Sequence, residues 1–292
     1  MSAKFSPSDA AVSIFGFIKA NPKFSYQYMA ISAIVGLLST IAFGASGLFE
    51  FMARFTEISQ SGNQPSTSEM MAAFNMLKHP QLAIVAIIST VITVAMLGMA
   101  LRKTVLNKEI GFYGLTWGKD ENQLGIAILQ LTGILFAAYI LAIIIGTLVA
   151  LASPFLALIA LVAFVLFMVF MLGRFGMYGV YTIINQKASL RQCASETKEQ
   201  FWSFVGAFFL CWAICSIALM VLQALTGLAL KPLMGDVGTN GIPTDFSGIF
   251  NIGAVLYFTL NGAFAGVVQL AVVCVGAFAY HKMNEAAPEA VQ

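Results

Sequence analysis

The chain has 292 residues, of which 59% are hydrophobic and only 10% are charged, and its formal net charge is +2. A soluble domain normally carries about 25% charged residues, so this composition excludes an ordinary soluble globular protein.

The hydrophobic residues gather in six long stretches that contain no Asp, Glu, Lys or Arg. Hydrocarbon about 30 Å thick requires roughly 20 apolar residues in a crossing helix, and each stretch reaches or approaches that length. Because the backbone in lipid must satisfy its own hydrogen bonds, these stretches are predicted to be helices. We therefore predict an all-α polytopic membrane protein whose six-helix transmembrane domain covers 26–280 as three hairpins. The predicted spans are 26–49, 80–101, 124–150, 155–173, 202–230 and 250–280.

A short amphipathic segment precedes each predicted hairpin. The first lies within 1–25 as a helix from Pro7 to Ala20, which Ser6 can cap. The second is Asn107–Trp117, and the third begins after Ser189. Such segments lie in the headgroup plane with their apolar residues buried. We interpret them as docking segments that orient the hairpins, and lipid or partner sensing is the alternative.

A further short helix is predicted between the first two spans, on the opposite side of the membrane. Ser66 and Glu69 have the spacing of a capping box, and Met70, Met71 and Phe74 follow at helical spacing. We expect this helix to lie at the membrane surface.

The distribution of Lys and Arg predicts the orientation of the chain. The N-terminal segment, the linkers 102–123 and 174–200, and the tail 281–292 hold 12 of the 15 Lys and Arg residues. Cytoplasmic segments are enriched in these residues. We therefore expect both termini in the cytoplasm and the protein in a bacterial inner membrane.

Two kinds of residue are candidates for helix packing inside the membrane. The side chains of Gln130 and Gln269 are predicted at similar depth in spans three and six, where they can form a hydrogen bond. Gly262, Gly266 and Gly276 recur along span six, and small residues at such spacing let helix backbones approach closely. This glycine seam can serve the chain's own bundle or a homo-oligomer.

Contacts with lipid headgroups are predicted at the cytoplasmic ends of the spans. Arg174 follows the fourth apolar stretch, where it can anchor the helix or bind a lipid phosphate. Arg191 and Trp202 are further candidates, since Trp202 marks the entry into span five at headgroup level.

The sequence contains none of the patterns that indicate catalysis or ion coupling. No Asp, Glu, Lys or Arg lies near the middle of a span, which argues against an ion-coupled or proton-coupled transporter. The chain has only two histidines and no hydrolase, nucleotide-binding or zinc motif. We expect no catalytic residues, no cofactor, no metal and no enzymatic activity.

Two linkers carry a resemblance to a known group of proteins. The stretch Val105–Leu124 combines aromatic residues with a Gly-x-Asp-Glu step, and Arg174–Ala207 combines a span-ending Arg with a Ser-Leu-Arg helix and a Phe-Trp pair. Both resemble uncharacterised multi-pass inner-membrane proteins of alphaproteobacteria, which are similar to the membrane region attached to some glycerophosphodiester phosphodiesterases. The resemblance implies six spans and an inner-membrane location, and it implies no phosphodiesterase activity because that catalytic domain is not expected here.

These observations lead to two hypotheses about function. The first is a non-enzymatic accessory, scaffolding or regulatory subunit that contacts membrane lipids, other membrane proteins or further copies of itself. The alternative is a carrier or channel for an apolar or zwitterionic small molecule or lipid, which would need a polar-lined cavity around Gln130, Asn261 and Gln269. No nucleic acid is expected among the partners.

Overall fold

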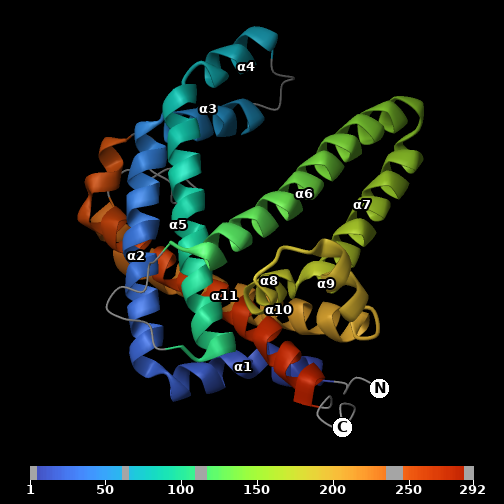
Figure 1. Cartoon of the computed structure of the whole chain (residues 1–292). Helices are drawn as coiled ribbons and strands as arrows, with labels where there is room; N and C mark the ends of the chain where they lie inside the picture. Colours follow the sequence, from blue (N-terminus) through green and yellow to red (C-terminus); the bar gives the residue numbers. More distant parts are fainter. Residues whose placement is uncertain (1–4, 61–65, 109–116, 235–245, 286–292) are drawn as a thin grey trace. The chain divides into compact units, whose positions relative to one another are not determined.

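The structure is a computed structural model that describes residues 5–60, 66–108, 117–234 and 246–285 (Figure 1). Within these ranges the regular elements are all helices. They are α1 (Pro7–Ala20), α2 (Pro22–Ala45), α3 (Leu48–Gln60), α4 (Thr67–Phe74), α5 (His79–Leu106), α6 (Lys119–Ala152), α7 (Pro154–Phe175), α8 (Tyr178–Asn185), α9 (Leu190–Glu196), α10 (Phe201–Met234), the short 3₁₀ helix η1 (Ser247–Phe250) and α11 (Ile252–Glu285).

Six segments are long and apolar enough to cross a membrane. They are α2, α5, α6, α10, α11 and the combined segment Leu158–Asn185, which covers most of α7 together with α8. The prediction of an all-α polytopic membrane protein is therefore confirmed. If each of these six segments crosses once, the end of α5, the start of α6, helix α9 and the start of α10 fall on the same side as α1. We name this side the N-side, because α1 precedes the first crossing.

The first span begins and ends four residues earlier than the sequence predicted, at Pro22–Ala45 instead of 26–49. Helix α2 ends at Ala45, and the chain turns at Gly47, whose φ of +83° strains any residue with a Cβ atom. The apolar residues Leu48 and Phe49 were assigned to this span, but they begin the separate helix α3. That boundary was wrong because residues after the corner are as apolar as those before it.

The fourth span also differs from its prediction, because it continues past residue 173. Helix α7 runs to Phe175, the chain turns at Gly176 and Met177, and α8 continues to Asn185. The predicted span ended at residue 173 because the next residue, Arg174, is charged. In the structure Arg174 belongs to the last turn of α7.

The short helices agree with their sequence signals where they are described. Helix α1 has the predicted limits, and the Ser6 hydroxyl accepts a hydrogen bond from the Asp9 N–H at 3.4 Å. The capping box of Ser66 and Glu69 begins α4, and α9 follows Ser189. The predicted segment Asn107–Trp117 falls largely on residues 109–116, outside the described residues.

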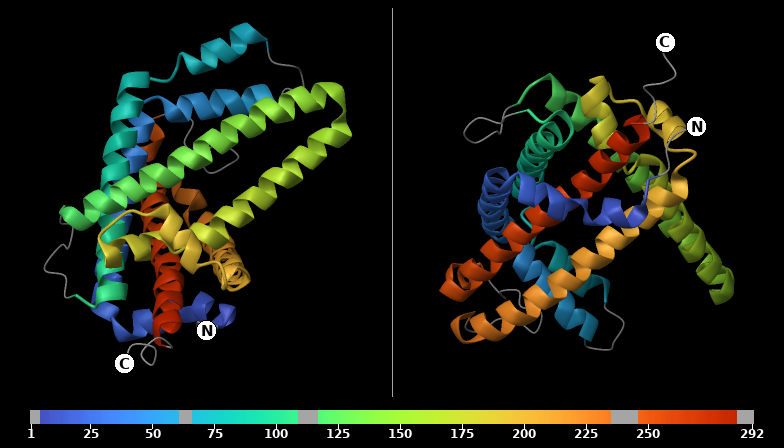
Figure 2. Two further views of the ribbon diagram at one scale, coloured as in Figure 1. Left: turned by 45° about the vertical axis from the view of Figure 1, so that its right-hand side comes forward. Right: turned by 90° about the horizontal axis from the view of Figure 1, so that it is seen from below.

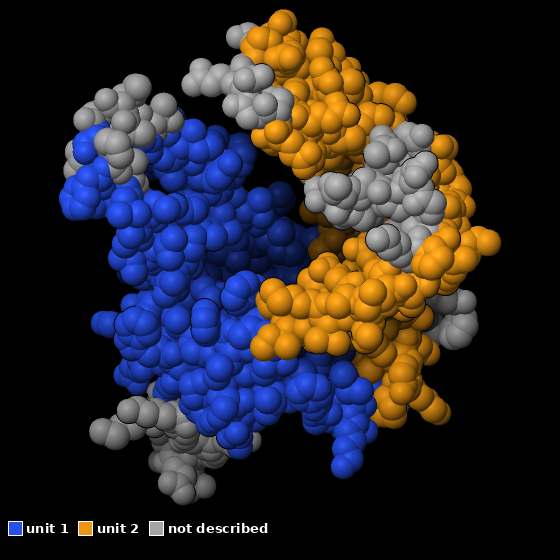
Figure 3. Space-filling model, turned by 180° about the vertical axis from the view of Figure 1, so that it is seen from behind, with its two compact units in different colours: residues 1–21, 94–214, 269–292 blue, residues 22–93, 215–268 orange. Residues whose placement is uncertain are grey.

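The chain forms two compact units, which Figure 3 colours separately. Unit 1 comprises 1–21, 94–214 and 269–292, and unit 2 comprises 22–93 and 215–268. In unit 1, α6 contacts α7 and α8, and α9 contacts α7 and α8. The left view of Figure 2 shows α6 and α7 diverging from the turn that joins them. In unit 2, α3 packs against both α2 and α4.

Candidate functional site

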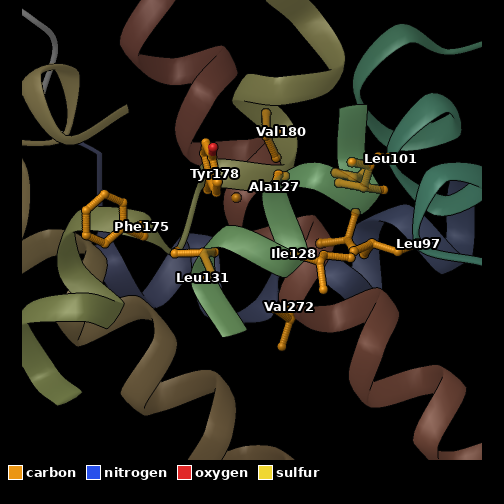
Figure 4. A pocket seen from close by; sticks show the side chains of 14 residues that line it. Leu97, Leu101, Ala127, Ile128, Leu131, Phe175, Tyr178, Val180 and Val272 are labelled. Carbon is orange, nitrogen blue, oxygen red and sulfur yellow. The ribbon is translucent and has the colours of Figure 1, made fainter. Parts of the chain in front are cut away.

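Unit 1 contains a pocket of about 170 Å³ (Figure 4). Its walls come from α5, from α6, from the junction between α7 and α8, and from α11, and the Tyr178 hydroxyl is the one polar side-chain group among them. A pocket of this composition suits an apolar occupant. The lining residues are Leu97, Leu101, Leu124, Ala127, Ile128, Leu131, Phe175, Gly176, Tyr178, Gly179, Val180, Val272, Val273 and Gly276.

The pocket lies toward the end of α5 and the start of α6. Leu101 precedes the end of α5 at Leu106 by five residues, and Leu124 follows the start of α6 at Lys119 by five, so both lie about 7–8 Å from these helix ends. The deepest wall residue on α6, Leu131, lies about 18 Å from that end.

Gly276, one of the predicted packing residues, lies in the pocket wall. A Cβ atom at this position would lie 3.1 Å from the Val180 Cγ2, which is tighter than ordinary van der Waals contact. The glycine therefore lets α11 approach α8 and close this side of the pocket.

A hydrogen bond between two helices borders the pocket. The Tyr178 hydroxyl on α8 donates to the Gln130 Oε1 on α6 at 2.5 Å, and the Tyr178 side chain is almost wholly buried. The Gln130 side chain itself is exposed on the surface of unit 1. The hydrogen bond described for Gln130 Oε1 joins α6 to α8 and does not involve Gln269. The contact between Gln130 and Gln269 stays a prediction.

A buried ion pair lies about one helical turn from the pocket, at the N-side end. The Arg102 guanidinium on α5 pairs with the Glu121 carboxylate on α6, which is completely buried. The Gly118 N–H donates to Glu121 Oε2 at 2.9 Å, so the same carboxylate caps the start of α6. A buried charge is tolerated only when it is paired and hydrogen-bonded, and this arrangement supplies both.

Sequence reasoning did not find the role of this ion pair. Arg102 counted only toward membrane orientation, and Glu121 was noted only within the linker resemblance. The available signal was the spacing of Gly118 and Glu121, because a carboxylate three residues into a helix start often bonds to a backbone N–H there.

Arg174 binds protein groups rather than standing free at the surface. Its guanidinium lies 5.7 Å from the ring centres of both Phe170 and Phe201, and its Nη1 donates to the Ala194 carbonyl at 3.0 Å. The Arg174 carbonyl in turn accepts the Thr197 hydroxyl at 3.0 Å. These contacts fasten the segment that contains α9 to the end of α7.

The other two residues predicted to contact headgroups lie on the surface of unit 1. Arg191 is exposed on α9, and Trp202, at the start of α10, is 76% exposed. Arg191 lies in the first turn of α9, and Trp202 lies in the first turn of α10. A cation and an amphipathic ring in these places match the composition of a membrane–water interface.

Cys193 is the buried residue of α9. Its side chain packs with Ala127, Tyr178 and Tyr181. Burial, reinforced by the nearby Glu196 carboxylate, raises the pKa of the Cys193 thiol to about 12. This cysteine is therefore a neutral packing group at physiological pH, without the thiolate that nucleophilic or metal chemistry requires.

Gly262 and Gly266 lie in unit 2, where they face α2. A Cβ on Gly36 of α2 would lie 2.7 Å from the Gly262 Cα, and one on Gly266 would lie 2.6 Å from the Ser32 Cβ. The Ser32 hydroxyl donates to the Gly262 carbonyl at 2.7 Å. This part of the glycine seam therefore serves packing within one chain.

Asn261, which the carrier hypothesis places in a polar cavity, bonds within its own helix. Its Nδ2 donates to the Tyr257 carbonyl at 2.9 Å, and neither Asn261, Gln130 nor Gln269 lines the pocket in unit 1. In the part of the chain that the structure describes, no three His, Cys, Asp or Glu side chains lie close enough to hold a metal ion.

Comparisons of the chain with protein-family models, with curated proteins and with solved structures found no match.

Proposed function

We propose that this chain is a non-enzymatic inner-membrane protein, an accessory or scaffolding subunit that binds a membrane lipid in the pocket of unit 1. The observation that carries the proposal is the apolar pocket of about 170 Å³ near the end of α5 and the start of α6. Engineered apolar cavities of about 150 Å³ stay dry and bind small hydrocarbons, so a pocket of this size can accept a segment of an acyl chain.

The surroundings of the pocket supply the remaining parts of a lipid site. The lining side chains leave an occupant few hydrogen-bonding groups, which favours hydrocarbon over a polar solute. On the N-side surface of the same unit, exposed Arg191 and Trp202 provide groups that contact headgroups. The Lys and Arg distribution supports placing this side in the cytoplasm, which makes the occupant a lipid of the cytoplasmic leaflet.

The proposal is tested by blocking the pocket without disturbing the core. Val272 lines the pocket and is 43% exposed, so Val272→Trp places a large ring at its opening. Val91 on α5 has 45% exposure and lies outside the pocket, so Val91→Trp is the matched control. Both variants and the wild type are purified in nanodiscs, released into a gentle detergent and weighed by native mass spectrometry.

We expect the wild type and Val91→Trp to retain a phospholipid that Val272→Trp loses. A lipid whose acyl chain carries a photoreactive diazirine should also cross-link to peptides of the pocket wall in the wild type, several-fold more than in Val272→Trp. Equal lipid retention and equal cross-linking in both tryptophan variants would contradict the proposal.

The alternative function is a carrier or channel for an apolar or zwitterionic molecule or lipid. The same pocket would then be one binding site on a transport pathway between the two leaflets. Liposomes containing the purified protein separate the hypotheses, because a lipid carrier accelerates the transfer of a fluorescent phospholipid between leaflets. An accessory protein leaves that rate at the level of protein-free liposomes.

A further inference from the structure

Helices α3 and α4 carry apolar side chains that the described residues of unit 2 leave exposed. Met52 and Phe55 on α3 are 39% and 40% exposed, and Met71 and Phe74 on α4 are 59% and 44% exposed. Within each helix the two residues are three positions apart, so they share one face. These four residues form what we term the apolar patch.

Both ends of the α3–α4 segment are fixed at the ends of spanning helices. Helix α3 begins three residues after α2 ends, and the Lys78 N–H, just before α5, donates to the Ser46 carbonyl at 2.9 Å. The Lys78 Nζ also donates to the Ala45 carbonyl at 3.2 Å. The segment therefore starts and finishes at one membrane surface, on the side opposite the N-side.

The directions of α3 and α4 agree with a position along this membrane surface. In the views of Figures 1 and 2, α3 and α4 extend sideways from the ends of α2 and α5 rather than continuing along them. The rings of Phe51 and Phe74 lie 5.4 Å apart and join the two helices. The pair thus has the form of a small platform beside two crossings.

The polar residues of the platform indicate how it lies. On α3, Arg54 and Glu57 form an exposed ion pair at 2.8 Å, and their positions fall on the opposite side of the helix from Met52 and Phe55. Glu69 is occupied in the capping box of α4. Acidic residues outnumber basic ones in α3 and α4, so attraction to anionic headgroups is not the binding force, and burial of apolar side chains is.

We propose that α3 and α4 lie in the leaflet opposite the N-side, with the apolar patch inserted among the upper parts of the acyl chains. Interfacial helices of this kind bury their apolar face about 5–10 Å into the headgroup–acyl boundary. The partner of this surface is the lipid bilayer itself, and the binding does not depend on anionic lipid.

Spin-label accessibility tests this placement. Phe55→Cys and Glu57→Cys are made separately in a chain whose native Cys193, Cys211, Cys215 and Cys274 are replaced by serine. Each variant is labelled with a nitroxide and placed in phosphatidylcholine nanodiscs. Collisions of the nitroxide with oxygen, which concentrates in hydrocarbon, are compared with collisions with a water-soluble nickel chelate.

We expect the label at 55 to collide several-fold more with oxygen than with the chelate, and the label at 57 to show the reverse. Adding anionic lipid should leave the result unchanged. If the chelate reaches both labels equally, the patch faces water and is free for a protein partner. If neither collider reaches position 55, the patch is covered by protein. Either result would overturn the proposal, without bearing on lipid binding in the pocket of unit 1.

Discussion

At the scale of single residues, the Arg102–Glu121 pair is the contact whose loss should cost the most stability. Removing one partner of a buried ion pair leaves the other charge without compensation, which typically costs about 3–5 kcal/mol. We expect Glu121→Gln to lower the free energy of unfolding by about that amount, measured by titration from mild detergent into sodium dodecyl sulfate. Asp120→Asn, one residue away and outside the pair, should change it by less than about 1 kcal/mol.

The double variant Arg102→Met with Glu121→Leu distinguishes loss of the pair from loss of local structure. Replacing both charges with apolar side chains of similar volume is often neutral or stabilising, so most of the lost stability should return. If the double variant is no more stable than Glu121→Gln, the single-variant effect does not come from an unpaired charge.

Cys193 gives a second prediction at this scale, through its pH dependence. The ordinary thiol pKa of 9.0 rises to about 12 in the folded chain, so at pH 8 the reactive thiolate should be rarer by a factor on the order of 10³ than in the unfolded chain. Alkylation by iodoacetamide, followed by mass spectrometry of the Cys193 peptide, should therefore be much slower in the folded protein. Equal rates in the folded and unfolded protein at pH 8 would refute this assignment.

The raised pKa of the Cys193 thiol also determines how the stability of the protein changes with pH. Between pH 9 and pH 12 the unfolded chain loses the Cys193 proton while the folded chain keeps it. Unfolding then releases a proton, so the contribution of this group to stability should fall as the pH rises through that window.

At the scale of helices, the approach of α2 to α11 depends on glycine. A Cβ on Gly36 would meet the backbone of Gly262 at 2.7 Å, and backbone cannot move aside as a flexible side chain can. We expect Gly36→Ala to destabilise the protein by about 1–3 kcal/mol, the usual cost of overpacking. The measurement is the same detergent titration of the free energy of unfolding.

Gly133 on α6 provides the matched control. A Cβ at that position would meet nothing within 4 Å, and alanine is the better helix former. Gly133→Ala should therefore be neutral or slightly stabilising. Comparable destabilisation by both substitutions would show that the α2–α11 contact does not have the geometry described.

Helices were predictable from sequence where a local signal marks their ends. Ser6 before Pro7 marked α1, and Ser66 with Glu69 marked α4, because side chains must satisfy the free N–H groups at a helix start. The corner at Gly47 was missed because hydropathy does not change there. The pocket wall and the Tyr178–Gln130 bond were beyond sequence reasoning, since they depend on how distant helices approach one another.

At the scale of the whole molecule, both lipid proposals depend on the order of the six crossings along the chain. If each of the six segments crosses once, the ends of α5, α7–α8 and α11 and the start of α6 share the N-side, and residues of these helices in unit 1 form the pocket. The same alternation would bring α3 and α4 to the opposite surface. The lipid proposals for these two places therefore share one premise, the alternation of crossings along the chain.

That premise is tested most directly by the accessibility of single cysteines in intact cells that express the protein. Gln60→Cys, at the end of α3, and Lys187→Cys, between α8 and α9, are made in the chain without native cysteines and exposed to a membrane-impermeant maleimide. We predict labelling at position 60 from outside the cytoplasmic membrane, and labelling at position 187 only after the cells are broken. Labelling of position 187 in intact cells, or of both positions from the same side, would contradict the account.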